Sequence, residues 1–157
     1  MYKLDSQWNL WYHSINDQNW EKSSYKKLIQ LKTLYDYKLI VSCFKKNHYQ
    51  NGMFFLMKDG IFPNWEDPLN RNGSFLSFKV SSGNVISGWS ELLFECINET
   101  IMNDDNKEIN GISISPKKEF NIVKIWFTTT NEKKHKSNFK ELNNDLVLKN
   151  CLYKKHF

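Results

Sequence analysis

The chain has 157 residues, a length typical of one domain of about 150 residues. Forty per cent of the residues are apolar and 15% are aromatic, which favours a folded globular protein over a disordered one. Lysine and arginine outnumber aspartate and glutamate by 22 to 17. The net charge of +5 is compatible with a phosphate-bearing partner but weaker than expected of a duplex-DNA binder. We therefore expect residues 1–157 to form a single domain.

Membrane and secreted proteins are excluded by the pattern of apolar residues and cysteines. The longest apolar run is 53–57, far short of the roughly 20 residues that span a bilayer. The first residues lead into no apolar stretch, so we expect no signal peptide. Cys43, Cys96 and Cys151 are widely spaced and odd in number, which favours reduced thiols. We expect a cytoplasmic protein with no membrane partner.

Hydrophobic periodicity predicts an alternation of strands and helices. Apolar and aromatic residues predict strands at 8–13, 25–32, 53–58, 75–80, 112–115, 120–130 and 147–153. Helical spacing predicts helices at about 34–45, from about 87 to the polar segment 103–106, and at 132–143. Thr33 and Asp36 resemble a capping box at the start of the first helix. Because strands outnumber helices and most strand links resemble hairpins, we expect an α+β fold: an antiparallel sheet with about three helices packed on one face.

The predicted strand at 120–130 has two different faces, because successive side chains point to opposite sides of a sheet. Val123, Ile125 and Phe127 form an apolar row that should pack beneath the helices. Lys124 and Trp126 project from the other face, together with Ile122 and Thr128. A tryptophan beside a lysine on an uncovered face is either a binding surface or an aromatic residue that merely covers the sheet.

The segment 60–73 is a long loop, since it contains two glycines, two prolines and three asparagines. Loops of this length are usually functional. Pro63 stiffens the segment that presents Trp65, where a core contact is improbable, so a ligand contact is favoured. Glu66 and Asp67 could alternatively form a metal-binding pair, but no histidine or third carboxylate in the loop supports this reading. We expect no metal and no cofactor.

Motifs along the whole chain resemble those of the eukaryotic translation initiation factor 4E family, whose members bind the 7-methylguanosine cap of messenger RNA. The resemblance rests on Trp8-Asn9-Leu10-Trp11, Trp20, Lys58-Asp59-Gly60-Ile61, Trp65-Glu66-Asp67, Trp89-Ser90-Glu91 and Ile125-Trp126-Phe127-Thr128, in the family's order and with compatible spacings. The chain is similar to a divergent, minimal member. Its bias toward lysine and asparagine and its lack of alanine fit a parasite or a large DNA virus, in which case the compartment would be the host cytoplasm.

The resemblance implies that the antiparallel sheet is curved, with about three helices packed on its convex face and a cap-binding slot on its concave side. Trp20 and Trp65 match the two tryptophans that stack on the methylated guanine, a cation with two π-faces. Glu66 matches the carboxylate that accepts hydrogen bonds from the guanine N1–H and N2–H₂ edge. Trp126 matches the residue that contacts the 7-methyl group.

The phosphate-binding side departs from the family. Lys117 stands where the family has an arginine, and Ile122 stands where it has a lysine. A lysine cannot grip phosphate oxygens in the bidentate manner of arginine, so this contact should be weaker or differently placed. Four further lysines are candidates for compensation or, alternatively, ordinary solvated charges: Lys118, Lys124, Lys154 and Lys155.

The helical side also departs from the family, whose members dock a helix of a scaffold factor or repressor there. Lys38 replaces the tryptophan that anchors this helix, and Ser90 replaces an apolar contact. Leu34 keeps its hydrophobic character, and Phe94 lies nearby in the expected second helix. We expect any scaffold partner to be divergent.

The resemblance implies a monomer that recognises capped messenger RNA, most simply to recruit it for translation. One alternative is a repressor that sequesters caps without the usual scaffold partner. A second alternative, of another class, is an enzyme acting on the cap or on free nucleotides. The four histidines are scattered and no nucleophilic triad or phosphate-binding loop is apparent, so we expect no catalysis.

Overall fold

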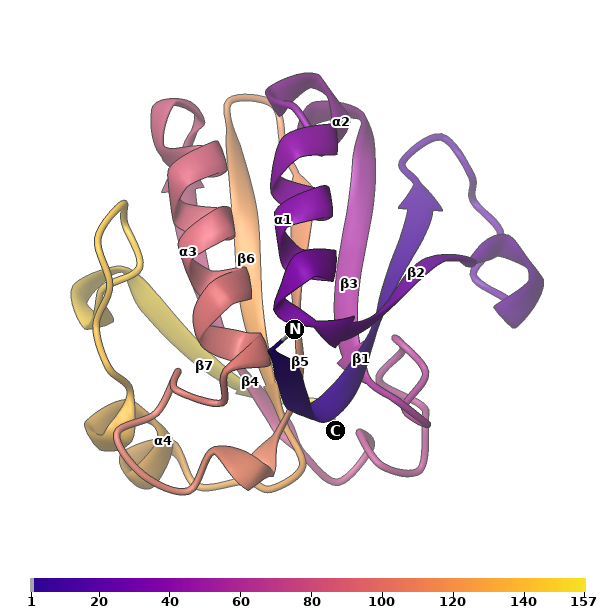
Figure 1. Cartoon of the computed structure of the whole chain (residues 1–157). Coiled ribbons are helices and arrows are strands. Elements are labelled where there is room, and N and C mark those ends of the chain that lie inside the picture. The colour runs from indigo at the N-terminus through magenta and orange to yellow at the C-terminus, as the bar shows by residue number, and fades with distance from the viewer. Residues whose placement is uncertain (1) are drawn as a thin grey trace.

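The computed structural model describes residues 2–157, which form one seven-stranded sheet with helices on one face (Figure 1). Neighbouring strands are all antiparallel, and their spatial order is β2-β1-β3-β5-β6-β4-β7. The strands are β1 (Lys3–Ser14), β2 (Lys26–Thr33), β3 (Gly52–Lys58), β4 (Ser74–Ser81), β5 (Ile109–Pro116), β6 (Phe120–Phe127) and β7 (Cys151–Lys155). The helices are α1 (Leu34–Cys43), α2 (Lys46–Asn51), α3 (Val85–Ile97) and α4 (Glu132–Asn138). The expected α+β class and curved antiparallel sheet are confirmed.

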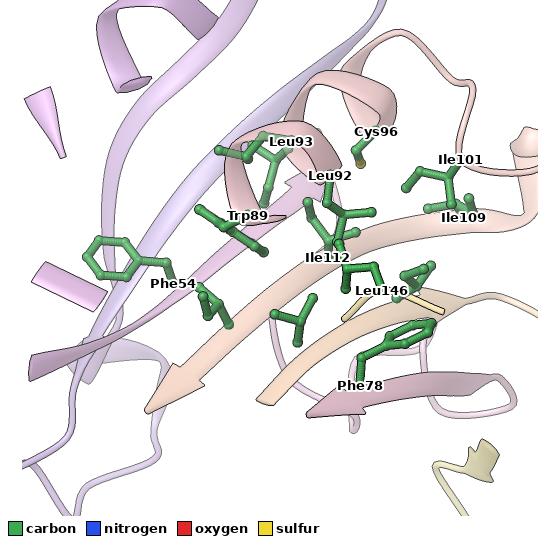
Figure 2. Close-up of a cluster of buried hydrophobic side chains, with 14 of the residues drawn as sticks. Phe54, Phe78, Trp89, Leu92, Leu93, Cys96, Ile101, Ile109, Ile112 and Leu146 are labelled. Carbon is green, nitrogen blue, oxygen red and sulfur yellow. The ribbon is translucent and has the colours of Figure 1, made fainter. Parts of the chain in front are cut away.

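The main core lies between the sheet and helices α1 and α3, which run side by side in front of the sheet in Figure 1. Helix α3 presents Trp89, Leu92 and Leu93 to this core, and all three are at most 1% exposed. Figure 2 shows them above inward-pointing strand residues such as Phe54 and Ile112. At about 1.5–3 kcal/mol for each large apolar side chain buried, this layer is the principal stabilising contact of the fold.

A smaller apolar cluster occupies the opposite, concave face. Its buried members are Tyr25, Phe55, Met57, Ile61 and Trp126. The two faces of β6 divide as the alternation predicts, because Val123, Ile125 and Phe127 belong to the main core and Trp126 to the smaller cluster.

The start of α1 agrees with its sequence signal. The Asp36 carboxylate accepts the backbone N–H of Thr33 at 3.0 Å, which satisfies a donor that a helix start would otherwise leave free. Two of the helices differ from expectation. Helix α2 was not expected, because Tyr49 is its only buried residue and so it carries no periodic signal. Helix α4 ends at Asn138 rather than at 143, where Phe139 leaves the helix to pack against Phe78.

The strand connections are mostly not hairpins, so that expectation was wrong. Within residues 2–157 only β1–β2 and β5–β6 are both consecutive and paired. The segment after β3 instead passes β5 and β6 to reach β4, a span of about 14 Å at roughly 4.8 Å for each strand. This crossing explains the length of the loop at 60–73. The last strand also begins later than expected, because a 3₁₀ turn at Leu148–Asn150 precedes its pairing with β4.

Candidate functional site

A pocket of about 240 Å³ opens on the concave face of the sheet. Its walls come from the loop after β1, from the loop at 60–73, and from strands β3, β5 and β6. The lining residues are Trp20, Tyr25, Met53, Phe55, Pro63, Asn64, Trp65, Glu66, Ser113, Ser115, Lys124 and Trp126. Aromatic side chains with one carboxylate and one ammonium group suit a flat, polar-edged ligand.

Trp20 forms one wall and is 52% exposed. One face of its indole stacks on His13, with ring centroids 4.0 Å apart and an interplanar angle of 4°. His13 is fully buried, with Nδ1 2.8 Å from the Ser14 carbonyl oxygen and Nε2 2.8 Å from the Asn19 carbonyl oxygen. The imidazole is therefore held from both sides, and it orders an otherwise exposed tryptophan.

Trp65 and Glu66 form the other wall, on a loop that is tied down by its own polar side chains. The Asp67 carboxylate accepts the backbone N–H groups of Phe62 at 3.0 Å and Leu69 at 2.9 Å. Trp65 itself is 44% exposed and meets the Phe157 ring edge-on at 5.4 Å. Because these contacts fix the backbone on both sides of Trp65, an exposed indole is held in a defined place.

Asn70 is the buried centre of this loop and is 0% exposed. Its Nδ2 donates to the carbonyl oxygens of Phe62 at 3.0 Å and Asn64 at 2.8 Å. Its Oδ1 accepts from Nδ2 of Asn110 on β5 at 2.9 Å. This chain of amides fastens the loop to the sheet.

Trp126 forms the floor and is 6% exposed. Its indole Nε1–H donates to the Ser113 hydroxyl at 2.9 Å, and the ring edge meets Phe55 at 6.3 Å between centroids. Glu66 lies at the exposed rim, and burial together with the Glu66 charge raises the pKa of the neighbouring Tyr25. The carboxylate is thus close to the aromatic wall.

The predicted cationic residues are divided among three hollows. Lys124 lines the pocket, and its Nζ lies 4.4 Å from the centroid of the Phe75 ring. Lys154 and Lys155 line an adjoining hollow of about 260 Å³, which shares Trp65, Lys124 and Trp126 with the pocket. Lys117 and Lys118 lie in a separate hollow at the β5–β6 turn. The structure therefore brings Lys124, Lys154 and Lys155 together, but it places Lys117 and Lys118 apart from them.

Two basic groups at this end of the sheet, Lys124 and His156, have lowered pKa values. Burial, together with the charges of Lys117 and Lys154, holds the pKa of Lys124 below its ordinary value. His156 lines the adjoining hollow, and burial together with the Lys124 charge lowers its pKa to about 4. Burial is the larger cause of both shifts, and a bound anion would offset the charge repulsion that adds to it.

The sequence prediction missed His13, Tyr25, Phe55, Ser113 and Ser115. Ser113 and Ser115 alternate with buried isoleucines on β5, so their position on the open face could have been read from the pattern. The stacking of His13 on Trp20 had no sequence signal, because a turn brings residues seven positions apart into contact.

The predicted partner-binding residues lie together on the outer surface of α1 and α3. Phe94 is 41% exposed and meets Tyr37 at 5.4 Å between ring centroids, while the Tyr37 hydroxyl donates to the Ser90 carbonyl at 2.9 Å. Lys38 is exposed, and Leu34 is half-buried against the main core.

Two observations on the part of the chain that the structure describes concern metal-binding groups and membrane-spanning helices. Residues 2–157 contain no group of three or more His, Cys, Asp or Glu side chains placed to hold a metal ion. None of the helices found there is long and apolar enough to cross a bilayer.

The chain is similar to known proteins over nearly its whole length. The sequence model of a family described as "Eukaryotic initiation factor 4E" matches residues 3–157. Eukaryotic translation initiation factor 4E of Candida albicans is 31% identical over 144 residues, which cover 85% of this chain and 68% of that protein. The Dictyostelium discoideum protein of the same name is 29% identical over 139 residues, covering 83% of this chain. This chain spans only 54% of the length of the Dictyostelium protein.

Solved structures agree on the fold. The structure of Ascaris suum eIF4E-3 in complex with the m7G cap superimposes with a TM-score of 0.81. It is 20% identical, and the superposition covers 99% of this chain and 92% of that one.

Proposed function

Because this chain belongs to the eukaryotic initiation factor 4E family, we propose that it binds the 7-methylguanosine cap of messenger RNA in the pocket between Trp20 and Trp65. The observation that carries the proposal is the pair of exposed indoles on two separate loops, which share one pocket with Glu66 and Trp126. Large exposed tryptophans are unfavourable unless a ligand covers them.

Methylation at N7 gives guanine a positive charge that is delocalised over a flat ring. A base between two indoles gains stacking on both faces, and the charge adds a cation–π attraction to each ring. The stack of His13 on the outer face of Trp20 keeps this indole from rotating away when no ligand is bound. In this arrangement Trp126, on the pocket floor, contacts the methyl group.

Glu66 supplies the base specificity. Its carboxylate accepts hydrogen bonds from the N1–H and N2–H₂ groups of guanine, while the backbone N–H of Trp65 serves O6. Adenine and the pyrimidines do not present two adjacent donors beside such an acceptor, so they would leave the carboxylate unpaired. The hydrogen bonds of Asp67 fix the backbone of this loop, and this keeps the Glu66 carboxylate at a constant position relative to the indoles.

The triphosphate follows the lysines of the adjoining hollow. Lys124 lies between the pocket and that hollow, and Lys154 and Lys155 line its outer side. Burial and, to a smaller extent, the neighbouring cations Lys117 and Lys154 lower the pKa of Lys124, and a triphosphate would supply a counter-charge to these cations. Lys117 and Lys118 both line a different hollow, and of these two the Lys117 charge adds to the positive field at Lys124.

The biological role that fits cap binding is recruitment of messenger RNA for translation in the cytoplasm, or in the host cytoplasm if the protein is viral. Phe94 and Leu34, on the helical face, would dock a divergent scaffold factor or repressor, and the exposed Lys38 of α1 would replace an apolar anchor there. A cap-sequestering repressor is the alternative role. Loss of scaffold binding in Phe94→Ala with unchanged cap affinity would support recruitment, and failure to bind any scaffold peptide would favour sequestration.

Tryptophan fluorescence tests the proposal directly, since Trp20 and Trp65 would both be quenched by a stacked base. We expect 7-methyl-GTP to bind about tenfold or more tightly than GTP, because only the methylated base is cationic. Trp65→Ala should abolish this preference, and Glu66→Gln should weaken binding of both nucleotides. Tyr35→Ala, which removes an exposed aromatic residue from α1, is the matched control and should bind normally.

Two further arms make the test specific. Lys124→Gln should lower the affinity for 7-methyl-GTP more than Lys118→Gln does, since only Lys124 lines the pocket. Equal affinity for methylated and unmethylated GTP would refute the proposal. Release of a product from capped RNA in the presence of divalent metal would replace it with an enzymatic function.

A further inference from the structure

The concave face of the sheet continues beyond the pocket as an uncovered surface, which we call the β4–β6–β7 face. Its residues are Phe75, Ser77 and Lys79 on β4, Lys124 on β6, and Leu152 and Lys154 on β7. The strand register places them in rows: Trp126, Phe75 and Lys154 form one row, and Lys124, Ser77 and Leu152 form the next. Directly opposed residues of neighbouring strands share one face, so this surface is continuous with the pocket floor.

This face combines an exposed apolar side chain with positive charges. Leu152 is 73% exposed, an unusual position for a leucine in a strand. Lys79 is exposed one row beyond it, opposite Ile122 of β6. The helices α1 and α3 lie on the other side of the sheet, so they do not cover this surface (Figure 1).

Its two central lysines are held by aromatic rings rather than left free in solvent. The Lys124 Nζ lies 4.4 Å from the centroid of Phe75, and the Lys79 Nζ lies 4.2 Å from the centroid of Phe120. A cation over an aromatic face loses less conformational freedom on binding an anion, because part of its ordering is already present. Both ammonium groups are therefore held in place by aromatic rings, Lys124 beside the pocket and Lys79 farther along the sheet.

The positive face ends abruptly. Beyond Lys79 the surface is lined by Glu119 and Asp145. Asp145 accepts hydrogen bonds from the Ser81 backbone and side chain, which hold the pKa of its carboxyl below the ordinary value, so this end is anionic. From the row of Trp126 to the row of Lys79 the strand advances four residues, about 13 Å at roughly 3.3 Å per residue.

We propose that the β4–β6–β7 face binds the first few nucleotides that follow the cap, with Lys79 contacting a backbone phosphate and Leu152 a base. The inference rests on the proposed cap-binding function, because it is the triphosphate in the adjoining hollow that directs the RNA onto this surface. The charge of the face, its continuity with the pocket and its exposed apolar centre match a single-stranded polyanion with apolar bases. The anionic end at Glu119 and Asp145 limits the contact to a short segment.

Titrations with 7-methyl-GTP, a capped trinucleotide and a capped decanucleotide test the inference. We expect the capped trinucleotide to bind about five- to tenfold more tightly than 7-methyl-GTP, from one phosphate and one base contact. The decanucleotide should bind no more tightly than the trinucleotide. The affinity for the capped trinucleotide should fall more steeply with salt than the affinity for 7-methyl-GTP. The slope of log K against log salt should differ by about 0.7, because one additional phosphate is contacted.

Variants separate this face from the pocket. Lys79→Gln and Leu152→Ser should each remove most of the gain for capped RNA, and Lys79→Gln should also remove the extra salt dependence, while both keep the affinity for 7-methyl-GTP. Lys133→Gln, at an exposed position of α4, is the matched charge control and should change neither quantity.

The outcomes distinguish the two proposals. No binding of 7-methyl-GTP would overturn cap binding itself. Normal binding of 7-methyl-GTP with no gain for capped RNA, or with a gain that survives both substitutions, would overturn the role of this face alone. Self-association in sedimentation experiments that is lost in Leu152→Ser would identify the face as a protein interface and would likewise overturn its role in RNA binding.

Discussion

Replacement of Asn70 by alanine should loosen the loop that carries Trp65 and Glu66. The side chain is 0% exposed and makes three hydrogen bonds, to the carbonyl oxygens of Phe62 and Asn64 and from the amide of Asn110. Alanine removes all three bonds and takes a donor from the carbonyl oxygens of Phe62 and Asn64. At about 1 kcal/mol for each bond, we expect the free energy of unfolding to fall by about 3 kcal/mol.

Binding should suffer in the same variant, because the loop would no longer hold the indole and the carboxylate in one register. Urea denaturation measures the stability change, and fluorescence titration with 7-methyl-GTP measures the affinity. We expect the affinity to fall about tenfold or more, a loss of roughly 1.4 kcal/mol for each factor of ten.

Asn72→Ala is the matched control, since Asn72 is an exposed asparagine of the same loop. It should change the free energy of unfolding by no more than about 0.5 kcal/mol. Asn110→Ala should reproduce part of the Asn70 effect. The two substitutions together should be less harmful than the sum of their separate effects, because they share one hydrogen bond. Equal stability and affinity in Asn70→Ala and Asn72→Ala would show that the loop is held by other contacts.

Two further predictions concern stability. Gly73→Ala should destabilise the protein by about 3 kcal/mol or more, because an added Cβ would overlap the carbonyl oxygen of Phe127. Gly83→Ala is the control and should be nearly neutral, because the space around Gly83 is open. Comparable midpoints of thermal unfolding for the two variants would contradict this prediction. Burial lowers the pKa of His156 to about 4 from 6.5. The unfolded chain therefore takes up a proton at this position first as the pH falls, which favours unfolding. We expect the free energy of unfolding to drop by about 1–2 kcal/mol between about pH 6.5 and 4, a value reduced to allow for solvent screening of this partly exposed group. The pKa of His135 is lowered as well, so His156→Asn should remove only part of the dependence of the unfolding free energy on pH. Urea denaturation at a series of pH values measures this dependence, and an unchanged dependence in the variant would exclude His156 as its cause.

Local patterns along the chain were sufficient for the class of fold, whereas the roles predicted for the candidate site residues came from the resemblance of whole motifs to a family. The apolar alternation of β6 separates Val123 and Phe127 from Trp126, because side chains of a strand must alternate between its faces. The capping residues Thr33 and Asp36 mark the start of α1 for a similarly local reason. Trp20 and Trp65 stand out because a core contact is improbable for a tryptophan on a polar or proline-stiffened loop, whereas Glu66 was identified by the resemblance.

Tertiary structure alone decided which of these residues meet, because strand order depends on packing between segments that are distant in the chain. The position of β4 beside β6 and β7 sets Lys124 and Lys154 on one surface and leaves Lys118 in another hollow. The support of Trp20 by His13 depends on a turn, and the fastening of Asn70 to Asn110 depends on the crossing of a loop over the sheet edge. The hydrophobic pattern of a segment determines which of its faces is buried, but it does not determine which other segment packs against that face.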